Sequence, residues 1–253
     1  MLSDDAFLRY SRQLLLEEVG PEGQEKLQAA TVLIVGLGGL GSPAALYLAA
    51  AGVGKILLAD DDQLEITNLQ RQILYRTHDL HKSKAQLAKR QIQDLNPLIE
   101  PVALPLRMQD QALLEAVHEV DLVLDCSDNM ATRHAVNQAC IQLEKPLISG
   151  SAVGFSGQLL VLTPPFAHGC YACLYPDQNL PQRNCRTAGV LGPVVGVIGT
   201  LQALEAIKML AGMPVALAGK LRLFDGKQQS WATLQLSADA GCAVCGGRHG
   251  NTR

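Results

Sequence analysis

Four cysteines fall into two Cys-x-x-Cys pairs, Cys170 with Cys173 and Cys242 with Cys245. Together the pairs supply four thiolates at a spacing suited to tetrahedral Zn²⁺, with Zn–S bonds of about 2.3 Å. A redox pair of the thioredoxin type opens a helix that follows a strand, and neither pair has that setting. The spacing therefore predicts a structural zinc site that ties the end of the chain to its middle, with no open position for catalysis at the metal.

A glycine-rich turn, Gly36-x-Gly38-x-x-Gly41, follows the apolar run Thr31 to Val35 and precedes an alanine-rich helical pattern. Glycine permits a tight turn and a close approach of the backbone to phosphate, and the N-terminus of a helix favours phosphate oxygens. Asp60 ends the next apolar run, where a carboxylate can accept hydrogen bonds from ribose hydroxyls. The pattern predicts a nucleotide site, and by itself it suits NAD as well as ATP.

Two cations and one acidic turn favour a triphosphate over a nicotinamide cofactor. Arg71 lies in the string NLQRQ at 68–72, Lys84 lies in the next helical pattern, and Asp128 lies in DCSDN at 125–129. Arg71 and Lys84 could converge on a polyphosphate, and Asp128 could hold Mg²⁺ through its carboxylate oxygens. Nucleotidyl transfer needs such groups because charge develops on non-bridging oxygens, whereas hydride transfer needs none of them. Taken singly, each residue also fits a solvated cation, a surface ion pair or a helix cap.

The remaining three cysteines have different surroundings in the sequence. Cys126 follows an apolar run and Cys140 lies in a helical pattern, so both are expected to be small buried side chains. Cys185 lies in a polar stretch between Arg183 and Arg186, whose charges favour the thiolate. The pattern leaves open whether Cys185 is a nucleophile or an exposed thiol without a function.

Alternating strands and helices must position these residues. Apolar runs predict strands at 31–35, 55–59, 122–125 and 146–149, and amphipathic patterns predict helices at 43–51, 82–95, 110–117 and 131–143. This alternation implies a doubly wound, mainly parallel Rossmann-like α/β sheet. After residue 150, strand-like runs at 158–162, 220–224 and 230–236 predict an antiparallel extension. We expect a single domain over 1–253, with a helical arm at 1–30 and two halves at 31–150 and 151–253.

The composition restricts the class of protein. The chain has 253 residues, with 21 Lys and Arg against 24 Asp and Glu, so its near-neutral charge argues against a nucleic-acid binder. The longest uncharged stretch, 187–204, contains several glycines and a proline, and we interpret it as a buried loop and helix instead of a membrane span. The acidic start MLSDDAFLRY lacks the layout of a signal peptide, so a cytoplasmic protein is expected. The polar stretch 176–187 is expected to be a mobile loop.

The strings GLGGLG at 36–41, NLQRQ at 68–72 and DCSDN at 125–129, with Asp60 and Lys84, together resemble the MoeB/ThiF family of adenylating enzymes. That family is related to the enzymes that activate ubiquitin, and the likeness runs from RYSRQ at 9–13 to the last cysteine pair. The resemblance implies that MgATP is bound, and that a small ubiquitin-like sulfur carrier attacks the α-phosphorus with its C-terminal glycine carboxylate. An acyl-adenylate and pyrophosphate would result. The family also carries a zinc site.

The resemblance assigns roles to individual residues. Contacts to ATP are implied for Gly39, Asp60, Asn68, Arg71 and Lys84, and Asp128 would position Mg²⁺. The whole nucleotide site is expected to comprise Gly36, Gly38, Gly39, Gly41, Asp60, Thr67, Asn68, Leu69, Gln70, Arg71, Lys84, Asp128 and Asn129. Arg12, placed by the RYSRQ match, would be supplied to the active site of the other subunit, which implies a homodimer. From its pattern alone the first helix would be a solvated arm.

Two further strings, RNCRTAGV at 183–190 and SAVGFSGQLLVLTPP at 151–165, are more similar to the ThiF branch of thiamine biosynthesis than to the MoeB branch of molybdopterin biosynthesis. In ThiF-like proteins the residue at Cys185 would link covalently to the carrier after adenylation. The second half of the chain would bind a ThiS-type carrier, and a separate sulfurtransferase or cysteine desulfurase would supply sulfur for its thiocarboxylate. The alternatives are MoeB-type activation of the small subunit of molybdopterin synthase, an NAD-dependent oxidoreductase, and a non-enzymatic scaffold.

Overall fold

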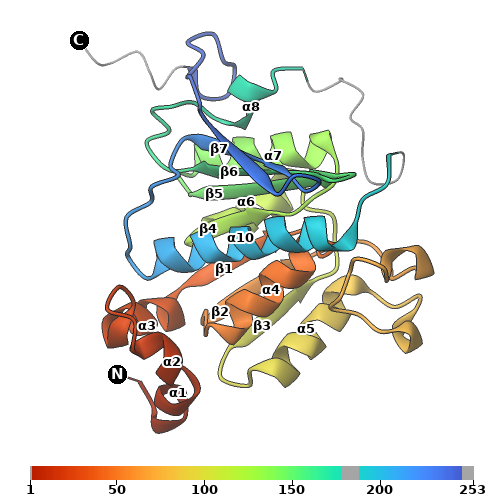
Figure 1. Cartoon of the computed structure of the whole chain (residues 1–253), viewed down its shortest axis with the longest axis vertical. Coiled ribbons are helices and arrows are strands. Elements are labelled where there is room, and N and C mark those ends of the chain that lie inside the picture. Colours follow the sequence, from red (N-terminus) through yellow and green to blue (C-terminus); the bar gives the residue numbers. More distant parts are fainter. Residues whose placement is uncertain (1, 178–187, 247–253) are drawn as a thin grey trace.

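One mixed sheet of eight strands organises the part of the chain that the structure describes, residues 2–177 and 188–246. In this computed structural model the strand order is β3-β2-β1-β4-β5-β6-β7-β8 (Figure 1). The strands are β1 (Thr31–Val35), β2 (Lys55–Ala59), β3 (Glu100–Leu104), β4 (Leu122–Asp125), β5 (Leu147–Val153), β6 (Ser156–Leu162), β7 (Lys220–Asp225) and β8 (Ser230–Gln235). The helices are α1 (Asp4–Arg9), α2 (Ser11–Leu14), α3 (Gly20–Ala29), α4 (Gly41–Ala50), α5 (Lys84–Leu95), α6 (Asp110–His118), α7 (Met130–Gln142), α8 (Tyr171–Leu174) and α10 (Gly192–Leu210), with 3-10 turns η1 (Ile66–Asn68) and η2 (Thr77–Asp79).

The strands β1 to β5 are parallel to one another, and β6 to β8 continue the sheet in antiparallel hairpins. Strand β1 pairs with β2 on one side and with β4 on the other, so the direction of chain progression reverses between β1 and β4. The prediction of a doubly wound, mainly parallel sheet with an antiparallel extension is confirmed. Ligand sites in such sheets form beyond the carboxyl ends of the strands at this reversal.

Two apolar cores lie on the two faces of the sheet. Along β1 the side chains alternate, with Val32 and Ile34 in one core and Leu33 and Val35 in the other, as the pleat of a strand requires. Helices α3, α4, α5 and α10 contribute to the first core, and α6, α7 and α8 to the second. The first group of helices covers the near face of the sheet in Figure 1. A strand buried on both faces reads as a continuous apolar run, which is why the sequence predicts β1 well.

Helix α10 contains much of the uncharged stretch 187–204, which is predicted to lie inside the protein. By length and composition alone it could cross a membrane. In the folded chain it packs on α4, β5 and β6, and Val195, Ile198 and Ala203 are buried in the first core. The prediction of a helix packed inside the protein is confirmed, and these contacts account for its apolar character. The prediction of a buried loop is wrong for its described residues, because Ala188, Gly189 and Leu191 are exposed and full burial begins only at Val194.

Strand β3 has no counterpart among the predicted strands. It begins with Glu100-Pro101 and lacks a clear alternation, and proline cannot donate to a ladder hydrogen bond. The position of β3 at the edge of the sheet explains how Pro101 is accommodated. Cys126 and Cys140 are buried, as predicted. The predicted loop at 176–187, apart from Pro176 and Asp177, lies outside the described residues, and so does Cys185.

Candidate functional site

A cavity of about 1250 Å³ opens at the carboxyl ends of β1, β2 and β4. Its walls come from the turn after β1, the segment after β2, the start of α5 and the turn between β4 and α7. Residues from β5, β6 and the end of α8 close the opposite side. The cavity therefore lies at the reversal of strand order, where the fold concentrates loop residues from distant parts of the chain.

The glycine turn forms the floor of this cavity. Gly36 has a φ of +91°, and a Cβ added there would lie 2.8 Å from the Cys126 carbonyl oxygen. A Cβ on Gly41 would lie 2.0 Å from the Gly36 carbonyl oxygen, so both positions exclude larger residues for reasons of backbone packing. Gly38 and Gly39 line the cavity itself. The turn therefore presents bare backbone to a ligand while its two ends are fixed by close contacts.

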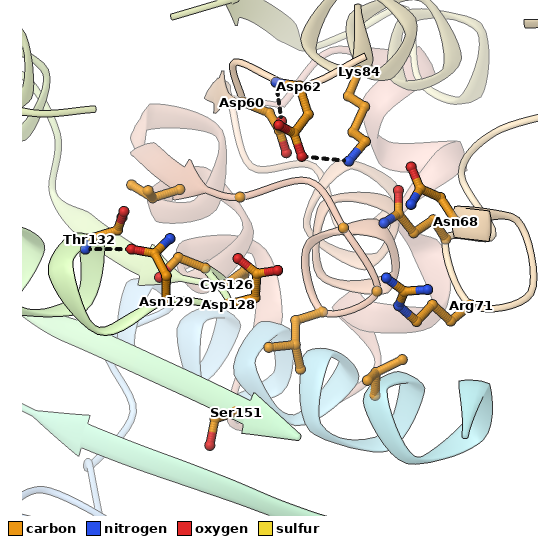
Figure 2. A pocket seen from close by; sticks show the side chains of 18 of the residues that line it. Asp60, Asp62, Asn68, Arg71, Lys84, Cys126, Asp128, Asn129, Thr132 and Ser151 are labelled. Carbon is orange, nitrogen blue, oxygen red and sulfur yellow. Dashed lines mark hydrogen bonds and ion pairs between the residues drawn. The ribbon is translucent and has the colours of Figure 1, made fainter. Parts of the chain in front are cut away.

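Asp60 lies beside the glycine turn at the end of β2. Its Oδ2 accepts a hydrogen bond from the Leu37 N–H at 2.7 Å, and its Oδ1 accepts one from the Asp62 N–H at 2.9 Å. Burial raises the pKa of Asp60, while the Lys84 charge and the two backbone donors act in the opposite direction. The carboxylate thus braces the turn that carries Gly38 and also faces the cavity (Figure 2).

Both predicted cations line the cavity. Lys84 is 4% exposed, and its Nζ lies 3.1 Å from Asp62 Oδ2. The Arg71 Nη1 donates a hydrogen bond to the Thr67 carbonyl oxygen at 3.1 Å. The Asn68 side chain caps the short turn η1, which holds this segment against the cavity. Figure 2 shows Lys84, Asn68 and Arg71 on one side of the cavity.

The turn between β4 and α7 forms the wall across from these cations (Figure 2). Asp128 is exposed there, and Asn129 caps α7 by accepting a hydrogen bond from the Thr132 N–H at 2.9 Å. The Asn129 side chain also lines the cavity. An exposed carboxylate thus faces the cations across a space that a polyphosphate could occupy.

Buried Arg133 stabilises the turn between β4 and α7. Arg133 is 4% exposed and donates hydrogen bonds to the carbonyl oxygens of Ser127 and Gly150, the latter at 2.9 Å. Its Nη1 lies 4.0 Å from the buried carboxylate of Asp125, whose Oδ1 accepts a hydrogen bond from Ser127 Oγ at 2.6 Å. A buried charge needs such partners, so this network fixes the turn that carries Asp128.

The structure brings most of the predicted nucleotide-site residues to one cavity. The lining includes Gly36, Gly38, Gly39, Asp60, Thr67, Asn68, Gln70, Arg71, Lys84, Asp128 and Asn129. Gly41 lies beneath the turn and Leu69 packs against the first core, so neither belongs to the lining as described. The sequence patterns did not predict six further lining residues, which are Asp62, Gln72, Arg107, Arg133, Gln158 and Tyr175. Of these, Arg133 had a usable signal, since it begins the second turn of the helix that follows DCSDN.

The four cysteines of the two pairs meet near α8. Their sulfur atoms all lie within 4.8 Å of one another, with Cys170 Sγ 3.8 Å from Cys242 Sγ and Cys173 Sγ 3.4 Å from Cys245 Sγ. A disulfide would require about 2.05 Å. Four sulfurs around Zn²⁺ at about 2.3 Å lie roughly 3.8 Å apart, so the observed spacing fits a tetrahedral ion. Burial raises the pKa of Cys170 and of Cys245, and a divalent cation would favour their thiolates.

The helical arm, α1 to α3, lies at one end of the molecule, opposite α8 (Figure 1). Several of its apolar side chains are exposed. Phe7 is 55% exposed, Leu8 72% and Leu15 74%. Arg12 lies among them on α2, exposed, and it is not among the described residues that line the cavity of its own chain. Exposed apolar side chains gathered on one segment are typical of surfaces that take part in interactions.

This chain is similar to known proteins along almost its whole length. Residues 10–244 match the model of the ThiF family. The sulfur carrier protein ThiS adenylyltransferase of Escherichia coli (strain K12) is 58% identical over 246 residues, which covers 97% of this chain and 98% of that protein. The sulfur carrier protein adenylyltransferase of Thermus thermophilus is 44% identical, covering 94% of this chain and 90% of that one. The crystal structure of E. coli MccB with ATP has a TM-score of 0.81 at 27% identity and covers 94% of this chain and 73% of that chain.

Proposed function

The chain belongs to the ThiF family, and from that membership we propose that it is an ATP-dependent adenylyltransferase acting on a ThiS-type sulfur-carrier protein in thiamine biosynthesis. The observation that carries the proposal is 58% identity to a ThiS adenylyltransferase along 97% of the chain. The cavity supports it, because a bare glycine turn, two cations and an exposed carboxylate meet there. Nicotinamide chemistry would require none of the charged groups.

The proposed reaction is adenylation of the carrier, and the charges that surround the cavity suit it. The carrier's C-terminal carboxylate oxygen attacks the α-phosphorus of ATP, the bond from that phosphorus to the bridging oxygen breaks, and pyrophosphate leaves. Arg71 and Lys84 neutralise the charge that grows on the phosphate oxygens, and the amides of Gly38 and Gly39 supply neutral donors. The product is an acyl-adenylate, in which a poor electrophile has acquired AMP as a good leaving group.

Asp128 is the residue that would hold Mg²⁺ in this scheme. Its carboxylate is exposed on the cavity wall and lies across from the cations, and hard cations prefer oxygen ligands of this kind. The ion, when bound, would neutralise phosphate charge and orient the leaving pyrophosphate. The buried contacts of Arg133 hold the turn on which Asp128 lies.

The four-cysteine cluster is proposed as a structural zinc site. Cys170, Cys173, Cys242 and Cys245 supply four ligands at the sulfur spacing that tetrahedral Zn²⁺ requires. With four thiolates around it, the ion would have no position left for a substrate, so its contribution is to join the chain's last described segment to α8. The proposal of a structural role rests on this donor set.

Sulfur transfer is proposed to follow adenylation. A persulfide sulfur of a separate sulfurtransferase or cysteine desulfurase would displace AMP from the acyl-adenylate. The Cys185 thiolate would then attack the sulfur bonded to the acyl carbon and displace the donor's thiolate, which links Cys185 to the sulfur-bearing carrier through an acyl disulfide. A thiol reductant would cleave this disulfide and release the carrier thiocarboxylate and the Cys185 thiol. The support for Cys185 is the sequence of 183–190 and its likeness to the ThiF branch.

We also propose a homodimer in which Arg12 is supplied to the partner's active site. The exposed apolar side chains Phe7, Leu8 and Leu15 support an interface formed by the arm. The absence of Arg12 from its own chain's described cavity lining supports a role in the other subunit. Such a dimer would act in the cytoplasm.

Carrier-dependent exchange of labelled pyrophosphate into ATP tests the proposed activity. Exchange is expected with a ThiS-type carrier that ends in Gly-Gly and not with the same carrier lacking its last glycine. A preference for the small subunit of molybdopterin synthase would assign the chain to the other pathway. Absence of exchange with every carrier, together with binding of NAD, would refute the adenylyltransferase.

A further inference from the structure

Asn137 is a buried polar side chain that joins helix α7 to the cysteine cluster. It is 0% exposed. Its Nδ2 donates a hydrogen bond to Cys170 Sγ at 3.5 Å, and its Oδ1 accepts one from the Tyr171 backbone N–H at 3.0 Å. A single amide group therefore holds both one cysteine and the first residue of α8.

The four-cysteine cluster needs hydrogen-bond donors next to its sulfur atoms. Four thiolates around Zn²⁺ leave a net negative charge, and Cys170 and Cys245 are buried. Buried charge is costly unless hydrogen bonds satisfy it. The Asn137 amide supplies such a bond to Cys170, and the Asp239 backbone N–H supplies another to Cys173 Sγ at 3.5 Å. The amide thus favours the thiolate form of a metal ligand and fixes its orientation.

Helix α7 connects this contact with the cavity. The helix starts at the cavity wall, where Asn129 caps it and Arg133 lines the site. Asn137 lies seven residues beyond Met130, the first residue of α7, about 10 Å along the helix axis. From the cluster, α8 leads back to Tyr175, which also lines the cavity.

The connection from the cysteine cluster through α8 ends on strand β6. The Tyr175 hydroxyl donates a hydrogen bond to Gln158 Oε1 at 2.8 Å, and Gln158 belongs to β6 and to the cavity wall. The cysteine cluster is therefore linked to two separate walls of the cavity, through α7 and through α8.

We propose that Asn137 is the positioning residue that docks the metal-binding segment onto α7. It does so by donating to the Cys170 thiolate and accepting from the Tyr171 amide, which also sets the place of α8 and Tyr175 on the cavity wall. The proposal rests on the zinc site proposed above. It assigns a metal-retaining role to a residue of the nucleotide-binding half of the chain.

The substitution Asn137→Asp tests it in the full-length zinc-loaded protein. Aspartate has the same shape and still accepts from Tyr171, but it replaces the N–H donor by an anionic oxygen beside the thiolate. We expect zinc to pass to the chelator 4-(2-pyridylazo)resorcinol roughly 10-fold to 100-fold faster than from the wild type. In protein loaded with Co²⁺, the thiolate charge-transfer band should shift.

Asn96→Asp is the matched control. Asn96 is also 0% exposed, and its Nδ2 donates to Tyr10 Oη at 2.8 Å and to the Ala49 carbonyl oxygen at 2.7 Å, away from the cysteines. It should lower the melting temperature while leaving the zinc release rate of the folded protein unchanged. Equally fast zinc release from both variants would show general destabilisation and overturn the proposal. Zinc release from Asn137→Asp at the wild-type rate would overturn it as well.

A direct measurement on the wild type covers the case in which Asn137→Asp does not fold. In protein loaded with ¹¹³Cd²⁺ and labelled with ¹⁵N, a scalar coupling between cadmium and the side-chain amide protons of Asn137 is expected through the N–H···S bond. Its absence overturns the role of Asn137 while the metal site stands. A wild-type chain that binds neither Zn²⁺ nor Cd²⁺ refutes the metal site itself and the positioning role with it.

Discussion

Replacing Lys84 by methionine should reduce pyrophosphate exchange by two to three orders of magnitude. Methionine keeps much of the volume of this side chain, which is 4% exposed, but it removes the cation. Loss of one preorganised electrostatic contact to a transition state costs about 3 kcal/mol, roughly a hundredfold in rate. A second cost arises because Asp62, whose carboxylate lies 3.1 Å from the Lys84 ammonium, then faces the triphosphate without a partner.

The second cost is the smaller one. The Asp62 side chain is 51% exposed, so water and salt screen its charge, and half-exposed pairs of this kind contribute about 1 kcal/mol or less. We therefore expect Lys84→Met to lose roughly another fivefold from the uncompensated carboxylate. The double variant Asp62→Asn with Lys84→Met should recover that fivefold and no more. The assay is carrier-dependent exchange of labelled pyrophosphate at saturating carrier.

Lys82→Met is the matched control for the loss of a lysine. The Lys82 ammonium lies 3.0 Å from Asp79 Oδ1, a distance like that of the Lys84 pair, but Lys82 is not part of the described cavity lining. Arg90 also binds Asp79, at 2.8 Å, so the carboxylate keeps a partner. Exchange by Lys82→Met should stay within twofold of the wild type. Wild-type exchange by Lys84→Met, or equal losses in both variants, would refute the reasoning from cavity charge.

Three further predictions concern the other sites. Arg12→Ala should abolish exchange in the homodimer. Mixing it with Lys84→Met under conditions of subunit exchange should restore activity, since in the mixed dimer one active site holds both Lys84 and the partner's Arg12. If activity does not recover, Arg12 acts within its own subunit. Cys185→Ala should keep pyrophosphate exchange while thiocarboxylate formation, followed by mass spectrometry of the carrier, falls at least tenfold; unchanged sulfur transfer would leave Cys185 an exposed thiol without a function. Cys242→Ser should release the metal and lower the melting temperature, as measured by elemental analysis and calorimetry. A wild-type protein that contains no metal and is as stable as the metal-loaded protein would exclude the zinc site.

The nucleotide half was predictable because its signals are local. A strand buried on both faces, a glycine turn and a helix follow one another within residues 31–50, and each is recognised from neighbouring residues. Strand β3 was not predicted because its first residues, Glu100-Pro101, are tolerated only at the edge of a sheet. Whether a strand lies at the edge depends on the order of the other strands and cannot be seen in the segment itself. The sequence places Arg133 in the helix after DCSDN, but it does not show that this charge is buried, because its acceptors, the carbonyl oxygens of Ser127 and Gly150, belong to two other segments.

The sequence by itself determined the alternation of strands and helices, the glycine turn, the two Cys-x-x-Cys pairs and the family, because all of these depend on residue type and short spacing. The tertiary structure decided that Lys84 pairs with Asp62 and lies across the cavity from Asp128, and that Asn137 reaches Cys170. These contacts depend on the strand order β2-β1-β4-β5, which brings the carboxyl ends of strands far apart in the chain to one edge. Spacing along a chain predicts only what lies within a turn or a strand, and the packing of the sheet and its helices determines which distant groups meet.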